Sequence, residues 1–159
     1  MTATQFVSHG GEGLWAYDVA LGVFLKHLID ATEAQEPLPE WLGTAVQDWR
    51  RTACISDYGL NFDAGWSSEQ IATVVALVER ACAALGARES IPSIEVESWR
   101  ILGDVRMSAR GAASIPTANV SALGRAIRSL LTGTLPASPS GTAWLYGTQE
   151  APSTIGMRR

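Results

Sequence analysis

The sequence predicts an α+β fold that is mainly helical, with about four helices and short strands or hairpins. Apolar residues recur in steps of three and four along four stretches without proline, which is typical of helices that turn one face to a core. The stretches between them are short and rich in turn residues, so they leave room only for short strands. Of the 159 residues, 47% are hydrophobic. We therefore expect one globular domain over residues 1–159.

The N-terminal third predicts a strand followed by two helices. Residues 3–8 are expected to form a short strand, and the glycine-rich residues 9–13 a flexible turn. The apolar positions that follow step by three and four and predict a helix over residues 14–31. A second helix is expected over residues 40–54, because the Pro-Leu-Pro before it suits the start of a helix.

The third helix has the clearest signal in the chain. Ser67 followed three residues later by Gln70 predicts a capping box, in which each side chain binds a backbone N–H of the first turn. Behind it, the apolar steps predict a helix over residues 68–85. A fourth helix is expected over residues 118–132, and residues 57–66 are expected to be irregular.

Two further stretches predict short strands. Gly103-Asp104 has the form of a two-residue hairpin turn between residues 99–102 and 105–107, although a helix through Trp99 is an open alternative. A C-terminal hairpin is expected between residues 142–147 and 153–157.

Composition and the ends of the chain predict a cytoplasmic protein. The start of the sequence has no basic segment followed by an apolar one, so we expect no secretory leader. The longest uncharged run is broken by proline and glycine, and we expect no membrane span. Two isolated cysteines, Cys54 and Cys82, are then expected to be reduced thiols in apolar surroundings.

The motifs of several common functional sites are missing from the sequence. The string His9-Gly-Gly-Glu-Gly is similar to an esterase oxyanion loop, but there is no Gly-x-Ser-x-Gly motif and no histidine after His27. The one lysine, Lys26, stands outside any Walker motif. Histidine and cysteine are not spaced as ligands, so we expect no metal and no cofactor. A sequence pI near 5.1 disfavours nucleic acid as a partner.

Acidic and aromatic residues concentrate between residues 30 and 66. This stretch holds seven acidic residues and two arginines. We expect Trp41 and Trp49, on one helix, to be in the core, and Tyr58 and Trp66, among turn residues, to be exposed. An acidic surface with aromatic anchors suits a basic protein, because charge speeds the encounter and aromatic rings fill pockets. The predicted partner-binding residues are Glu33, Glu36, Glu40, Asp48, Asp57, Tyr58, Asp63 and Trp66.

Three stretches, together with the acidic, tryptophan-rich composition, carry a resemblance to a known class of proteins. They are LWAYDVALGVFLKHLIDA, WSSEQIATVVALVERA and IPTANVSALGRAIRSLL, the last followed by GTAWLYG. The chain resembles the immunity proteins of bacterial polymorphic-toxin and contact-dependent growth inhibition systems. The resemblance implies a toxin inhibitor that binds a cognate toxin, often a basic nuclease, and blocks its active site. Acidic side chains would then occupy positions that normally receive phosphates.

Two other functions stay open at this point. The chain could be another non-catalytic interaction or adaptor protein, for example one that forms a homodimer through the predicted helix at residues 14–29. It could also be an enzyme with an unfamiliar site, for which a deep pocket lined by Asp57, Asp63 or Glu69 would be the sign.

Overall fold

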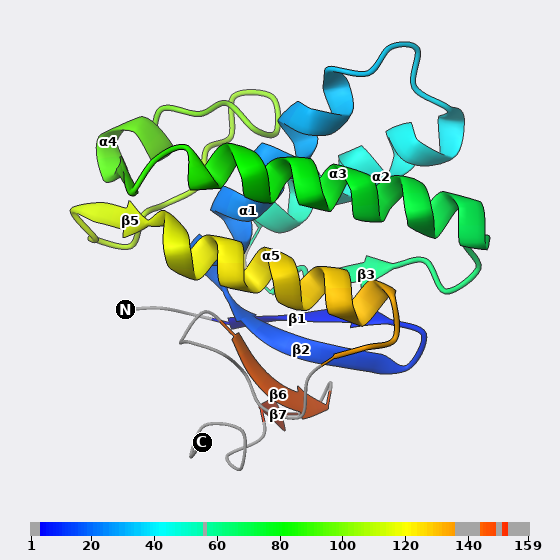
Figure 1. Cartoon of the computed structure of the whole chain (residues 1–159). Helices are drawn as coiled ribbons and strands as arrows, with labels where there is room; N and C mark the ends of the chain where they lie inside the picture. Colours follow the sequence, from blue (N-terminus) through cyan, green and yellow to red (C-terminus); the bar gives the residue numbers. More distant parts are fainter. Residues whose placement is uncertain (1–3, 56, 136–143, 149–150, 153–159) are drawn as a thin grey trace.

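A computed structural model describes residues 4–55, 57–135, 144–148 and 151–152. It confirms a mainly helical α+β fold, with the helices on one side of a sheet (Figure 1). In chain order the elements are β1 (Thr4–His9), β2 (Glu12–Tyr17), α1 (Asp18–Glu33), α2 (Glu40–Cys54), β3 (Leu60–Phe62), α3 (Ser68–Gly86), β4 (Ser90–Pro92), α4 (Ser93–Val96), β5 (Ser114–Pro116), α5 (Thr117–Leu131), β6 (Trp144–Thr148) and β7 (Ala151–Pro152).

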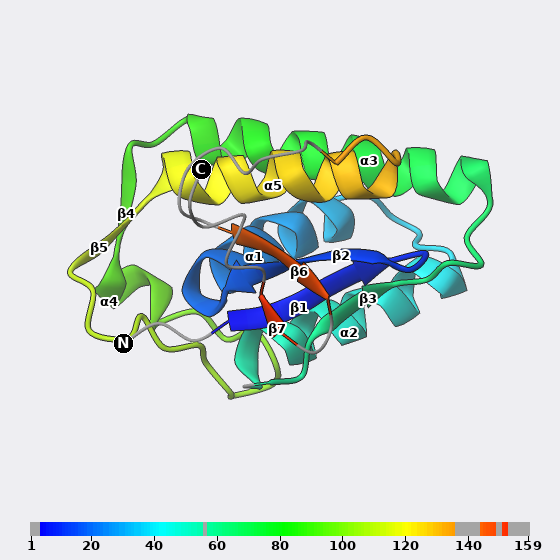
Figure 2. The same cartoon turned by 90° about the horizontal axis from the view of Figure 1, so that it is seen from below.

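The main sheet has the strand order β3-β1-β2-β6-β7. Strands β1 and β2 form an antiparallel hairpin in which His9 faces Glu12 across Gly10 and Gly11. Both glycines have positive φ, 58° and 89°, as the tight two-residue turn of a hairpin requires. Strand β3 pairs with β1 in parallel and ends the sheet on that side. The view from below in Figure 2 shows the strands in front of α1 and α2, with α5 and α3 running along one side.

The prediction of a helix from residue 14 was wrong at its start. Residues 14–17 belong to β2, and α1 begins at Asp18. The spacing from Leu14 to Tyr17 fits a helix, but burial alternates along this segment, with Leu14 and Ala16 buried and their neighbours half-buried. Pairing with β1 satisfies the backbone of these residues, and the Gly-Gly turn makes that pairing possible.

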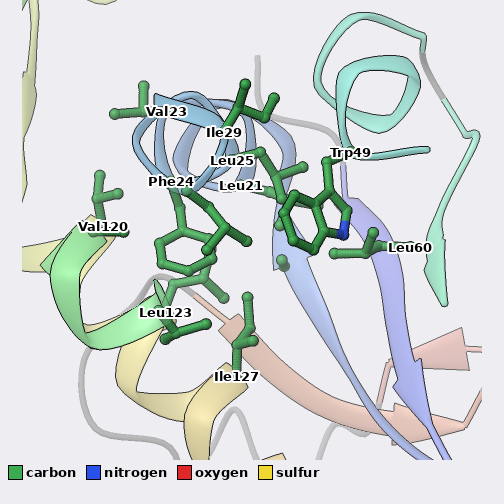
Figure 3. Close-up of a cluster of buried hydrophobic side chains, with 14 of the residues drawn as sticks. Leu21, Val23, Phe24, Leu25, Ile29, Trp49, Leu60, Val120, Leu123 and Ile127 are labelled. Carbon is green, nitrogen blue, oxygen red and sulfur yellow. The ribbon is translucent and has the colours of Figure 1, made fainter. Parts of the chain in front are cut away.

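Helix α1 lies at the centre of the helical layer. It packs against α2, α3 and α5, and its buried side chains include Leu21, Phe24 and Leu28, each with no exposed surface. Figure 3 shows Phe24 pointing toward Leu123 of α5. The apolar residues of α1 that would form a homodimer interface are therefore used in the protein's own core.

The predictions for the second, third and fourth helices are confirmed. In the capping box of α3, the Ser67 hydroxyl accepts a hydrogen bond from the Gln70 N–H over 3.1 Å, and the Gln70 amide oxygen accepts one from the Ser67 N–H over 2.8 Å. The predicted irregular stretch at 57–66 contains the short strand β3 instead of loop alone. Trp49 of α2 is 1% exposed and lies beside Leu60 of β3 (Figure 3).

The region between α3 and α5 differs from the predicted hairpin. Strands β4 and β5 form a separate two-stranded sheet, and α4 is a short helix. Around Gly103, one bridge joins Leu102 to Val105, and no longer strand forms in this described segment. The Arg50 guanidinium donates to the carbonyl of Ile101 and ties this segment to α2. At the C-terminus, β6 pairs with β7, while the predicted partner at 153–157 lies outside the described residues.

Candidate functional site

Two hollows lie at the edge strand β3. The first, which we call the edge hollow, has a volume of about 530 Å³, and the second, the indole hollow, about 500 Å³. Asp48 and Asn61 line both, so the hollows adjoin. The edge hollow is lined by Thr4, Gln5, Phe6, Ser8, Trp15, Asp48, Thr52, Asp57, Tyr58, Gly59, Leu60 and Asn61. The indole hollow is lined by Glu40, Trp41, Thr44, Ala45, Asp48, Trp49, Asn61, Asp63, Gly65, Trp66 and Gln70.

A buried glutamine fixes the shape of the edge hollow. The Gln5 amide nitrogen donates to the carbonyl of Thr52 over 3.0 Å, and its oxygen accepts from the Gly59 N–H over 2.9 Å. The Thr52 hydroxyl donates to the Gly59 carbonyl over 2.6 Å. These bonds tie the end of α2 and the loop before β3 to strand β1. The loop thereby presents Asp57 and Tyr58 at the surface, where Tyr58 is 46% exposed.

Four aromatic rings run from the indole hollow into the core. The centroids of Trp41 and Trp66 are 5.5 Å apart with planes at 68°, an edge-to-face contact. Trp66 lies 6.0 Å from Phe62, and Phe62 lies 6.5 Å from the buried Trp49. The predictions of a core Trp41 and an exposed Trp66 were therefore both wrong, because the two indoles are half-buried against each other at the core's margin.

Three carboxylates stand around the indole hollow. Glu40 is exposed in the first turn of α2. The carboxylate of Asp48 forms an ion pair with the guanidinium of the exposed Arg51, with nitrogen and oxygen 3.1 Å apart. The carboxylate of Asp63 accepts from the Gly65 N–H over 2.7 Å, which closes a local turn before Trp66. Among the described residues, none that lines either hollow is a lysine, arginine or histidine. The field in both hollows is therefore negative.

The structure brings six of the eight predicted partner-binding residues to these hollows. They are Glu40, Asp48, Asp57, Tyr58, Asp63 and Trp66. Glu33 lines neither hollow, since its carboxylate pairs with Arg50. Glu36 is exposed in the segment between α1 and α2 and also lines neither.

Sequence reasoning missed the contribution of the sheet to the edge hollow. Phe6 and Trp15 are cross-strand partners with ring centroids 5.3 Å apart, and both line the hollow. The Ser8 hydroxyl donates to the side-chain oxygen of Asn61 over 3.0 Å and joins β1 to the edge strand. The Gly10-Gly11 pair was the signal available in the sequence, because such a pair favours a two-residue hairpin turn.

The carboxylates considered for catalysis do not share a cavity. Asp57 lines the edge hollow, Asp63 the indole hollow, and Glu69 a third hollow of about 600 Å³ beside Pro37 and Thr73. Acid–base chemistry on one substrate needs two such groups facing the same space, and the carboxylate that shares a hollow with Asp57 and with Asp63 is Asp48. Among the described residues, no three His, Cys, Asp or Glu side chains come together in a way that could hold a metal ion.

Ionisation is shifted at groups away from the hollows. Burial raises the pKa of the Cys54 and Cys82 thiols, which are free cysteines at the margin of the core. On the surface, hydrogen bonds from Arg88 lower the pKa of Glu95. None of these four residues lines either hollow, so the pKa shifts bear on the stability of the fold and the reactivity of the thiols.

Comparison of the chain with protein-family models, with curated proteins and with solved structures gave no match. Along the described residues, no helix combines the length and the apolar character that crossing a membrane requires.

Proposed function

We propose that this chain is a toxin-neutralising immunity protein, acting in the cytoplasm, that binds a basic, nuclease-type toxin through the acidic surface at β3. The observation that carries the proposal is the pair of adjoining hollows, which collect six of the predicted acidic and aromatic residues and have no basic residue in their described lining. Recognition of this kind needs complementary charge for a fast encounter and aromatic anchors for a slow release.

The architecture supports binding at this edge. Strand β3 is the last strand of the sheet, and edge strands are positions where a partner can lie against exposed backbone or side chains. The loop that carries Asp57 and Tyr58 is held by the bonds of Gln5, so the surface is formed before the partner arrives. A preformed surface lowers the entropy lost on binding.

The homodimeric adaptor has less support. The helix that would supply its interface is buried against α2, α3 and α5. The enzyme is the second alternative: Asp57 and Asp63 each share a hollow with Asp48, but nothing in the described part of the chain beyond this shared lining assigns these carboxylates a reaction.

The proposal is tested by co-expressing the chain with the proteins encoded beside it in its source genome. We expect one basic protein, harmful when expressed alone, to form a one-to-one complex with the chain. Because the attraction is between exposed charges, calorimetry is expected to show an affinity that falls steadily as salt is raised from 50 to 300 mM, conditions that shorten the screening length. A complex whose affinity is indifferent to salt, or the absence of any basic partner, would count against the proposal.

A further inference from the structure

The walls of the indole hollow are chemically suited to a cation. Trp41 and Trp66 meet edge to face at 5.5 Å, and three carboxylates, those of Glu40, Asp48 and Asp63, line the same space. Indole presents the most negative face of the aromatic side chains, and a cation within about 6 Å of its centroid is attracted to it. Carboxylates beside an indole therefore favour one kind of guest, an organic cation with a flat or apolar surface.

We propose that the indole hollow receives one arginine side chain of the partner, with the guanidinium stacked on an indole and hydrogen-bonded to the carboxylates. This inference rests on the proposed function, which makes the partner a basic protein. Arginine fits better than lysine because its guanidinium is planar, weakly hydrated and able to bind a carboxylate through two parallel N–H groups. Lysine's ammonium is compact and strongly hydrated, so it loses more by leaving water.

The hollow is rigid enough to select such a guest. Trp66 is supported by Phe62, which in turn packs against the buried Trp49. Along the sequence, the turn closed by Asp63 holds the backbone before Trp66, and the capping box at Ser67 holds the backbone after it. The two indoles therefore keep their mutual angle without a ligand, and little order has to be created on binding.

The charges around the hollow favour a cation on balance. Helices α2 and α3 both begin beside it, and each helix start is equivalent to roughly half a positive charge. Arg51 offsets part of the charge of Asp48, but that ion pair is exposed and exposed pairs are weak. Three full negative charges outweigh these contributions, so an arginine can compete with Arg51 for Asp48.

The test uses the whole chain and three small probes of similar size, which are the Nα-acetylated amides of arginine, lysine and norleucine. The chain has six tryptophans, whose indole N–H signals report separately in a nitrogen–proton NMR spectrum. We expect the arginine probe at millimolar concentration to shift the signals of Trp41 and Trp66 and to leave the signal of Trp99, which lines neither hollow, unchanged. The lysine probe should bind several-fold more weakly, and the uncharged norleucine probe should cause no shift.

Matched variants separate the site from its surroundings. Asp63→Asn removes one charge and keeps the oxygen that accepts from Gly65, and it should weaken the arginine probe about tenfold or more, as expected of a lost charge-assisted hydrogen bond. Trp66→Leu should weaken it about tenfold, which lies within the range of a cation–π contact. Asp104→Asn is the control, because it removes one charge from an exposed residue that lines neither hollow. This control should change the affinity for the probe less than twofold.

The outcomes distinguish this inference from the proposed function. Shifts that are equal for arginine and lysine, or present with norleucine, overturn the assignment of a guanidinium site. The same is true if Asp63→Asn and Asp104→Asn weaken binding equally. If the arginine probe leaves Trp41 and Trp66 unmoved while a basic toxin still binds, the inference fails and the proposed function stands. If the probe binds as expected and no toxin is found, the site stands and the proposed function fails.

Discussion

Gly124 of α5 lies where α5 approaches α1 and α3 closely, and an added methyl group there tests the packing directly. A Cβ built on Gly124 would stand 2.6 Å from the Cys82 sulfur of α3 and 2.8 Å from the Phe24 ring of α1. Ordinary contacts between such atoms are about 3.5–4.0 Å. Gly124→Ala therefore forces shifts of about 1 Å in a core where Phe24 has no exposed surface.

The size of the effect follows from two opposing contributions. Overpacking of a well-filled core costs about 1–3 kcal/mol. Replacing glycine by alanine inside a helix gains about 1 kcal/mol. Gly43→Ala in α2 is the matched control, because nothing lies within 4 Å of the added Cβ and only the gain in helix propensity applies. Since that gain is common to both variants, Gly124→Ala should be less stable than Gly43→Ala by about 1–3 kcal/mol.

Urea unfolding followed by tryptophan fluorescence measures this difference. We expect the midpoint of Gly43→Ala to lie above that of the parent chain, and the midpoint of Gly124→Ala to lie below that of Gly43→Ala, with similar slopes. Adding Cys82→Ala to Gly124→Ala should cost less than Cys82→Ala alone, because one of the two clashing atoms is then gone. Equal stability of the two glycine variants would refute the packing of α5 on α1 and α3.

Three further predictions concern other parts of the fold. Gln5→Leu removes the hydrogen bonds that Gln5 makes with the Thr52 carbonyl and the Gly59 N–H, and it should lower the free energy of unfolding by about 2 kcal/mol or more in the same urea assay. A change below about 0.5 kcal/mol would contradict the role of Gln5 in holding the loop before β3. Ser67→Ala removes the cap of α3 and should cost about 1 kcal/mol, seen as an earlier thermal midpoint. Burial raises the pKa of Cys54 and Cys82, so their thiolate fraction at pH 7.5 is below that of a free cysteine. Iodoacetamide reacts with the thiolate, so it should modify both cysteines slowly in the folded chain and at the ordinary rate in urea. Fast modification of the folded chain would show that the thiols are not buried.

Local signals predicted most of the helices, and non-local pairing accounts for what was missed. The capping box at Ser67 and the apolar steps behind it depend only on neighbouring residues, so the sequence reveals them directly. Strand β3 depends on a partner more than fifty residues away, since Asn61 pairs with Ser8, and no pattern within three residues announces such a strand. The segment at Leu14 fits helix and strand equally well, and only its pairing with β1 decides between them.

The candidate site was predictable in its charge and only partly in its shape. The acidic residues of α2 and of the loop after it are visible in the sequence as a run with few basic residues. That Trp41 and Trp66 come together could not be predicted, because one opens α2 and the other precedes α3. The exclusion of Glu33 likewise depends on a tertiary contact, its ion pair with Arg50.

A growth assay tests the central claim, that the acidic hollows at β3 neutralise a basic toxin. The basic protein encoded beside the chain would be expressed with the parent chain, with Asp57→Asn/Asp63→Asn, or with Glu89→Gln/Asp104→Asn. The two double variants lose the same charge, but the second changes exposed residues that line neither hollow. We predict that the parent chain and the second variant restore growth, while the first restores it poorly. Equal rescue by both variants would contradict the claim that the hollows carry the function.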